Sequence, residues 1–396
     1  MDHGSEILQS LFVVFVAAQI GAEIAQRLKL PGVVGEIAAG CVVGPSVLGW
    51  VHAAEALDVL AEIGVVLLLF SVGLETKLDE MKRVGKSALL VGVLGVVVPF
   101  VLGSLWAHGA GYAWAQSLFV AAAFVATSAG ITARVLQELG ALQREESRVI
   151  LGAAVIDDIL AMLLLGIVTA LQSGEALRIG HLAVILAEAV GFVVVIGLVG
   201  TRVMRRSSRW LEAPIHPLSP LTIVLALCLG LAFLSTQFGL AAIIGAFLAG
   251  MIASETAQRE TLEHQTQPLL ALMTPFFFVV TGSKVELAQL ADASALVALA
   301  IVTAIAVASK LAGGFLGALA LGRRGALIVG VGMVPRGEVG VVVASLGLAA
   351  GVFSPRVYAL IVAMSLATAM LTPPLLARLL REPPANDTRA GSDPAS

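Results

Sequence analysis

Long apolar segments, separated by short polar breaks, run through nearly the whole sequence. Spanning the hydrocarbon core of a bilayer takes about 20 mostly apolar residues in a helix, whose backbone groups satisfy one another there. Thirteen apolar segments cover residues 7–28, 32–49, 56–74, 88–106, 112–136, 149–171, 181–203, 218–237, 240–253, 268–280, 295–321, 326–350 and 357–380. They predict an all-α polytopic membrane protein with thirteen transmembrane helices.

The composition excludes several other classes of protein. Hydrophobic residues make up 58% of the chain and charged residues 13%, against about 25% charged residues in soluble domains. Too little polar surface is left for a soluble enzyme or a disordered scaffold, so the lipid bilayer is the expected surrounding. The formal net charge of −3 provides no basic patch, and no nucleic-acid partner is expected.

The Lys and Arg residues test the helix count, because cytoplasmic loops carry an excess of them. Loops after odd-numbered helices, together with the C-terminal tail, hold 19 of the 24 Lys and Arg residues. The other side holds only Arg178, Lys284 and Arg356, while Lys310 and Arg336 lie inside apolar segments. This distribution predicts an N-terminus outside and a C-terminus in the cytoplasm.

An odd number of helices with termini on opposite sides suits two inverted six-helix repeats joined by one linker helix. The sequence retains a trace of such a repeat. Displaced by 210 residues, PGVVGEIAAGCVV (31–43) lies over AAIIGAFLAGMIA (241–253), which matches Gly35 with Gly245 and Gly40 with Gly250. Under the same pairing, Thr-Ser-Ala-Gly (127–130) interrupts the fifth helix and Pro-Arg-Gly-Glu (335–338) interrupts the twelfth. Two broken, crossing helices are therefore expected.

Two adjacent carboxylates, Asp157 and Asp158, lie deep within the sixth segment. They follow Arg148 by nine and ten residues, which at 1.5 Å per residue places them about 14 Å into the bilayer. The apolar run before them argues against an interfacial or N-capping position. A carboxylate at that depth by default marks a functional site that faces the helix bundle. Adjacent helix positions differ by about 100°, so the two side chains are expected to have different roles.

Other polar groups lie at comparable depth. Lys310, near the middle of the eleventh segment, is the expected charge partner of a carboxylate, either as a structural counter-ion or as a proton carrier. Arg336 and Glu338 place opposite charges at the second interruption, where they either compensate the half-helix dipoles through a local salt bridge or take part in transport. Thr127 and Ser128 add hydroxyl oxygens beside the free carbonyls of the first interruption, which suits small ions.

Five further acids lie inside or near the apolar segments and receive no assignment from the sequence: Glu23, Glu36, Glu62, Glu75 and Glu188.

Four motifs occur in order along the chain: TSAGITARVLQELG (127–140), GAAVIDDIL (152–160), the isolated Lys310, and GMVPRGEVG (332–340). Together they resemble the monovalent cation:proton antiporter-2 family, and within it the NapA/GerN type of bacterial sodium/proton antiporter. The Asp-Asp pair is the most specific part. Electroneutral relatives of the wider superfamily tend to have Asn-Asp there, and glutathione-gated potassium-efflux relatives have Gln-Asp and a C-terminal nucleotide-binding domain, which is not expected here.

The resemblance implies a homodimer in the plasma (inner) membrane of a bacterium, with a dimerisation panel and a mobile ion-translocation core. By position in the motifs, Asp158 is the implied carrier of cation and proton, and Asp157 the partner of Lys310. Thr127 and Ser128 are the implied cavity lining. The implied boundaries are 1–85 and 218–292 for the panel, 86–172 and 293–382 for the core, 173–217 for the linker helix and loop, and 383–396 for a disordered tail.

The implied activity is exchange of a monovalent cation, Na⁺ or Li⁺, for protons by alternating access, without a cofactor. A dehydrated cation at Asp158 competes with protons there and at Lys310. If both residues release a proton, two H⁺ enter for each Na⁺ and exchange is electrogenic. A potassium/proton exchanger and an electroneutral exchanger of the same fold stay open. A passive cation channel is more distant, since it needs no lysine in its path, and an intramembrane aspartyl protease needs carboxylates on separate helices.

Overall fold

The computed structural model describes residues 3–51, 55–173, 179–207, 218–284, 290 and 292–381. Within these ranges every regular element is a helix, which confirms the all-α class. The predicted tail, 383–396, lies outside the described residues.

Up to the end of the linker, the helices are α1 (His3–Arg27), α2 (Gly32–Val43), α3 (Glu55–Leu74), α4 (Leu78–Gly109), α5 (Trp114–Val125), α6 (Ala129–Glu138), α7 (Glu145–Ser173), α8 (Ile179–Val195), a π-helical turn (Ile196–Gly200) and α9 (Thr201–Ser207). Beyond the linker they are α11 (Ser219–Gln237), α12 (Ala242–Ala253), α13 (Arg259–Ser283), α14 (Ala293–Gly317), a 3₁₀ turn (Leu319–Leu321), α15 (Gly322–Gly332), α16 (Glu338–Ala349) and α17 (Pro355–Arg381).

Ten helical stretches in the described ranges are long and apolar enough to cross a membrane. Shorter apolar helices, α2, α12 and part of α16, lie within the predicted second, ninth and twelfth segments. The chain is therefore a multi-pass membrane protein, while the count of thirteen crossings stays a prediction. Two helices extend well beyond their predicted starts: α4 begins at Leu78 and α13 at Arg259. Hydropathy marks only the apolar part of a helix, whereas acids such as Asp79 and Glu80 favour the first turn of α4 through the helix dipole.

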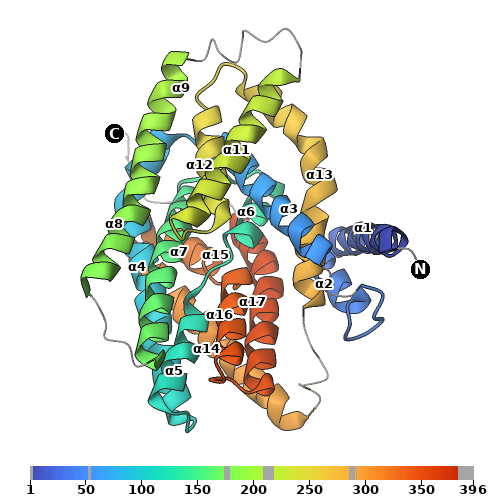
Figure 1. Ribbon diagram of the computed structural model, residues 1–396, viewed down its shortest axis with the longest axis vertical. Helices are drawn as coiled ribbons and strands as arrows, with labels where there is room; N and C mark the ends of the chain where they lie inside the picture. Colours follow the sequence, from blue (N-terminus) through green and yellow to red (C-terminus); the bar gives the residue numbers. More distant parts are fainter. Residues whose placement is uncertain are drawn as a thin grey trace, which may run out of the picture.

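The helices form two groups (Figure 1). One group contains α1, α2, α3, α11, α12 and α13, which contact one another in sequence-distant pairs such as α2 with α13 and α3 with α12. The other group contains α4, α5, α7 and α14 to α17, and we count α6 with it because α6 contacts α7 and α17, although α6 also contacts α2 and α3. The linker, from α8 to α9, runs along the left edge of Figure 1. We call these groups the panel and the core; the predicted domain boundaries stay predictions.

The glycines that the repeat pairs make equivalent backbone contacts. A Cβ atom at Gly35 in α2 would overlap the carbonyl of Gly21 in α1, and one at Gly245 in α12 would overlap the carbonyl of Leu231 in α11. The contacted residues are themselves 210 positions apart. Small residues allow membrane helices to approach this closely. The two matched contacts support the predicted repeat within the panel, and the inverted arrangement of the whole chain stays a prediction.

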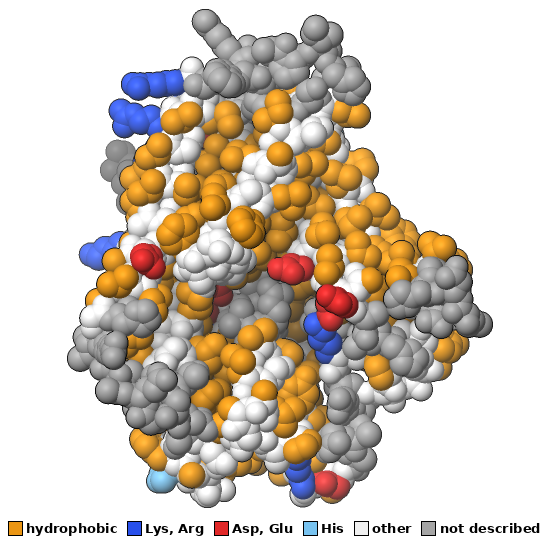
Figure 2. All heavy atoms as spheres, in the orientation of Figure 1, with side chains coloured by type: hydrophobic (Ala, Val, Ile, Leu, Met, Phe, Trp, Pro, Cys, Tyr) orange, Lys and Arg blue, Asp and Glu red, His pale blue; other side chains and the backbone are white. Residues whose placement is uncertain are grey.

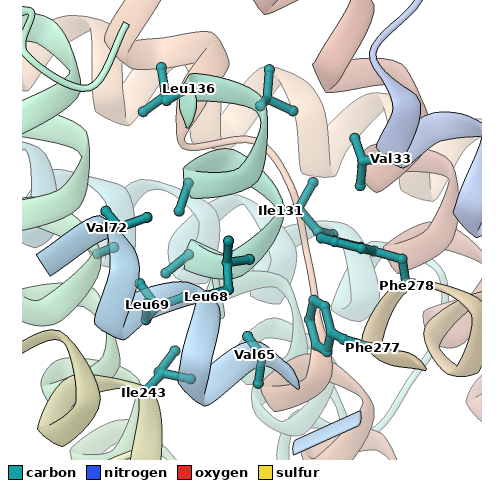
Figure 3. Close-up of a cluster of buried hydrophobic side chains, with 14 of the residues drawn as sticks. Val33, Val65, Leu68, Leu69, Val72, Ile131, Leu136, Ile243, Phe277 and Phe278 are labelled. Carbon is teal, nitrogen blue, oxygen red and sulfur yellow. The ribbon is translucent and has the colours of Figure 1, made fainter. Parts of the chain in front are cut away.

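An apolar cluster joins the panel to the half-helix α6 (Figure 3). Its buried side chains come from α2, α3, α6, α12 and α13 and include Val33, Val65, Leu68, Leu69, Val72, Ile131, Leu136, Ile243, Phe277 and Phe278. Contacts of this kind are van der Waals contacts, which have little directional preference. Asp157, Lys310 and Arg336, described below, lie on the core side of this boundary.

Candidate functional site

Two helix interruptions meet inside the core. Helix α5 ends at Val125 and α6 begins at Ala129, while α15 ends at Gly332 and α16 begins at Glu338. The Ser128 N–H donates a hydrogen bond to the Pro335 carbonyl, with N and O 2.8 Å apart. The two unwound segments therefore touch through their backbones, and both predicted interruptions are confirmed. The unwound segments begin and end within two residues of the predicted interruptions. The difference at the end of the first one arises because Ala129 and Gly130 already belong to α6.

Lys310 lies in α14 with a fully buried side chain. Its Nζ donates to three oxygens: Asp157 Oδ1 at 2.5 Å, the Val125 carbonyl at 2.7 Å and the Gly95 carbonyl at 2.8 Å. The three oxygens satisfy all three N–H groups of the ammonium. The expected pairing of Lys310 with an aspartate is therefore present, and two backbone acceptors complete it.

Asp157, in α7, holds both Lys310 and the first interruption. Its Oδ1 accepts from Lys310 and its Oδ2 accepts the Thr127 N–H at 3.2 Å, and the side chain is fully buried. The attraction within a buried ion pair offsets the cost of removing both charges from water only when their remaining hydrogen-bonding groups are also satisfied. By contrast, the Thr127 hydroxyl is buried and has no hydrogen-bond partner among the described residues.

Arg336 is also fully buried, and it reaches across to the other interrupted helix. Its Nη1 donates to the carbonyls of Val125 (3.1 Å) and Ala126 (3.4 Å), and its Nη2 to that of Ala306 (2.9 Å). The carbonyl end of a helix carries partial negative charge, so Arg336 and Lys310 together neutralise the end of α5. Glu338 begins α16, but its side chain lies outside the described residues, so the expected local pair with Arg336 stays untested.

Asp158, the next residue of α7, lines a cavity that includes neither Asp157 nor Lys310. Its side chain is 6% exposed, and this small cavity, of ≈10 Å³, lies at the boundary of core and panel. The core contributes Ala129 and Ala154 to this cavity, and the panel contributes Leu69 and Ile243. The two neighbouring aspartates thus have different surroundings, as their angular separation on the helix predicts.

A much larger cavity, of ≈730 Å³, approaches the crossing from one end of the molecule. It is lined by the first half of α3, including Glu62, and it reaches Arg336 and Gly337 at the second interruption. Ile243 lines both this cavity and the small one at Asp158. Figure 2 shows acidic side chains around a hollow near the centre of this face. Glu62 was left unassigned by the sequence, since hydropathy does not reveal which side of a helix faces a cavity.

Polar contacts close the opposite end of α3. Gln137 Nε2 donates to Ser71 Oγ at 3.0 Å and to Glu75 Oε1 at 3.3 Å, and Glu138 Oε2 accepts the Gly32 N–H at 3.1 Å. Burial raises the pKa of the Glu75 carboxyl, and the hydrogen bond from Gln137 partly offsets this. These contacts join α6 of the core to α2 and α3 of the panel.

The remaining unassigned acids have separate surroundings. Glu36 is buried in α2, and its Oε2 has no hydrogen-bond partner among the described residues. Glu23 pairs with Arg27 on exposed α1, and Glu188 is exposed on α8. None of these three contacts the crossing.

The chain is similar to known cation/proton antiporters over nearly its whole length. Over 416 aligned positions the chain is 34% identical to the high-affinity Na⁺/H⁺ antiporter NhaS3 of Synechocystis, covering 93% of this chain and 89% of that protein. It is 33% identical to the Na⁺/H⁺-K⁺ antiporter GerN of Bacillus cereus, covering 94% and 95%. Among solved structures, the sodium proton antiporter MjNhaP1 of Methanocaldococcus jannaschii matches with a TM-score of 0.68 over 94% of this chain and 96% of that one, at 16% identity.

The family profile described as "Sodium/hydrogen exchanger, transmembrane" matches residues 11–382. This range contains both helix interruptions, both adjacent aspartates and Lys310. With identity above 30% to full-length relatives and a shared fold, the chain belongs to the sodium/hydrogen exchanger family.

Proposed function

We propose that this protein exchanges a monovalent cation, Na⁺ and also Li⁺, for protons across the membrane. The observation that carries the proposal is the division of labour between two neighbouring aspartates: Asp157 is bound to Lys310, while Asp158 lines a cavity at the boundary of core and panel. A cation bound in this cavity would contact the carboxylate that lines it, and a proton would bind to the same oxygen atoms. Asp158 therefore serves as the shared binding group for the two.

The unwound segment beside Asp158 supplies neutral oxygens for a dehydrated cation. Thr127 and Ser128 lie between α5 and α6, and backbone carbonyls in such an unwound segment lie outside the helical hydrogen-bond pattern. The buried Thr127 hydroxyl has no partner among the described residues, so it has acceptor capacity to offer. Hard oxygen ligands of this kind suit Na⁺ and Li⁺. No cofactor is needed, since the cation and the protons are the substrates.

Alternating access follows from movement of the core against the panel. In this conformation the large cavity opens toward the first half of α3, and Gln137 and Glu138 contact the panel near its other end. Breaking these polar contacts and closing the cavity would expose Asp158 to the opposite side. We place the cavity on the extracellular side of the membrane, because it is lined by the first half of α3 and the predicted orientation puts the start of α3 outside. The panel is the proposed surface for a homodimer.

Lys310 is the candidate second proton carrier. It is as deeply buried as Asp157 and touches the interrupted helix directly at the Val125 carbonyl. If Lys310 and Asp158 each release one proton per cation, one net charge moves in each cycle. Exchange then responds to membrane potential at about 2.3 kcal/mol per 100 mV. This is the electrogenic scheme that we favour over an electroneutral one.

A potassium/proton exchanger is the second candidate. GerN is named as a Na⁺/H⁺-K⁺ antiporter, and the K⁺/H⁺ antiporter subunit KhtU of Bacillus subtilis is 27% identical over 89% of this chain. Relatives at these levels of identity are thus named for different cations. The same transport measurement therefore has to compare the cations directly.

The test is exchange in sealed proteoliposomes with an imposed pH gradient and a lumenal pH dye. Na⁺, Li⁺, K⁺ and choline are added in turn. We expect Na⁺ and Li⁺ to dissipate the gradient, choline to have no effect, and Asp158→Asn to abolish the response. Asp292→Asn is the matched control: Asp292 is an exposed N-cap of α14, and Asn caps a helix as well as Asp. Near wild-type exchange by Asp158→Asn would remove Asp158 from the mechanism.

A further inference from the structure

A second cavity, of ≈420 Å³, lies between the start of α4 and the end of α9. It shares no residue with the site at the helix crossing. Four basic side chains line it: Lys82 from α4 and Arg202, Arg205 and Arg206 from α9. The three arginines are spaced i, i+3 and i+4, so they share one face of α9. In Figure 2 basic side chains project at the upper left, where Figure 1 places α9.

The ion pairs around this cavity leave an excess of positive charge. Arg205 is bound on two sides, to Glu255 at 2.7 and 2.9 Å and to Asp79 at 2.8 Å, and Lys82 lies 3.3 Å from the same Asp79. Within the described part of the chain, neither Arg202 nor Arg206 forms an ion pair. Two carboxylates therefore face four cations.

The walls of the cavity are apolar where they meet the surface that faces lipid. Leu78 and Leu198 line it, and Leu198 continues into exposed apolar residues of the linker, including Val194, Val199 and Val203. The basic groups lie at the ends of two long apolar helices, where the hydrocarbon gives way to the headgroups. Cations above an apolar wall match a molecule with a phosphate at one end and acyl chains at the other.

We propose that this cavity binds the phosphate group of an anionic phospholipid, with Arg202 and Arg206 as the principal contacts and the acyl chains along the linker. Arg205 ties α9 to Asp79 in α4 and to Glu255 beyond α12, so the phosphate lies at the junction of linker, core and panel. Free phosphate has the same charged group as the headgroup but no apolar part that could pack against Leu78 and Leu198. The apolar wall favours the lipid as its source.

The test uses the full-length protein in detergent, with its thermal unfolding measured after addition of phosphatidylglycerol, phosphatidylcholine or inorganic phosphate. We expect phosphatidylglycerol to stabilise the wild type more than phosphatidylcholine does, and inorganic phosphate to have no effect. In the double variant Arg202→Gln/Arg206→Gln, the phosphatidylglycerol concentration for half-maximal stabilisation should rise at least about tenfold. Native mass spectrometry on the wild type, counting retained lipids of each kind, provides the second measurement.

Arg83→Gln/Lys86→Gln is the matched control, because it removes the same charge from exposed positions of α4 that do not line the cavity. It should respond as the wild type does. Equal stabilisation of the wild type and Arg202→Gln/Arg206→Gln by phosphatidylglycerol would overturn the proposal. Stabilisation by inorganic phosphate alone would overturn the lipid assignment. Should the double variant not fold, Arg206→Gln at the exposed end of α9 gives the same comparison.

Discussion

Removing Lys310 should destabilise the protein more than removing Lys310 and Asp157 together. In Lys310→Gln the Asp157 carboxylate, which is fully buried, keeps the Thr127 N–H as its one donor among the described residues. Stranding one member of a buried ion pair costs about 3–5 kcal/mol. In Lys310→Gln/Asp157→Asn no charge is stranded, and the loss is limited to hydrogen bonds worth about 0.5–1.5 kcal/mol each. The three hydrogen bonds of Lys310 amount to about 1.5–4.5 kcal/mol, so the double variant should be more stable than Lys310→Gln by about 1 kcal/mol.

The comparison needs four proteins in the same detergent: wild type, each single variant and the double variant. Their order of thermal unfolding temperatures is the readout. Asp157→Asn should be milder than Lys310→Gln, because Lys310 keeps the carbonyls of Gly95 and Val125 as acceptors. The ion pair between Lys284 and Asp58, at 2.9 Å with both side chains nearly half exposed, is the matched control. The same substitutions there should cost only about 0–1 kcal/mol.

The same double variant decides whether Lys310 carries a proton. With Asp158 intact, exchange should continue but lose one transported proton per cycle and become insensitive to a valinomycin-clamped potential. Persisting voltage dependence in an active, folded double variant would leave Asp158 as the only carrier. A double variant that unfolds at or below the temperature of Lys310→Gln would refute the pairing argument itself.

Three further predictions address the crossing, the closed end and the orientation. A Cβ atom at Gly337 would lie 2.6 Å from Ser128 Cβ, so Gly337→Ala should lower stability by about 1–3 kcal/mol; an unchanged unfolding temperature would contradict this contact. The pKa of Glu75 is raised in the folded state, so the folded state binds this proton more readily than the unfolded state does. Stability should therefore fall as the pH rises above the ordinary pKa of a glutamate. In unfolding measured at several pH values, Glu75→Gln should flatten this decline. A cytoplasmic reporter fused after Arg381 should be active and a cysteine replacing Ser5 should label from outside; labelling of both ends from one side would reject the orientation.

The charged side chains of the buried network could be predicted from the sequence, but the backbone carbonyls that accept hydrogen bonds from them could not. Depth in an apolar segment singles out Asp157 and Lys310, since few forces other than mutual pairing keep such charges in a membrane. The carbonyls of Gly95 and Val125 carry no residue-specific signal. The reach of Arg336 to α5 was likewise hidden, because sequence reasoning pairs it with the nearest opposite charge, Glu338.

Helix interruptions were predictable to within two residues, and cavities were not. Thr127 and Pro335 belong to runs that break an apolar pattern, which is a local property of the chain. Whether Glu62 faces lipid, protein or water depends on helices far away in sequence. Hydropathy averages over the helix circumference, so it loses this information.

The cavity beside Asp158 is lined by residues of both the core and the panel, so the charge at this site and the size of the space beside it depend on different parts of the protein. The charges belong to the core, whereas Leu69 and Ile243, which limit the room beside the carboxylate, belong to the panel. Under the proposed role of Asp158 as the ion-binding group, substitutions at these two apolar positions would resize the space for a larger or smaller ion while Asp157, Lys310 and Arg336 keep their partners. Preference for one alkali ion over another can thus drift between relatives without any change in the residues that identify the family.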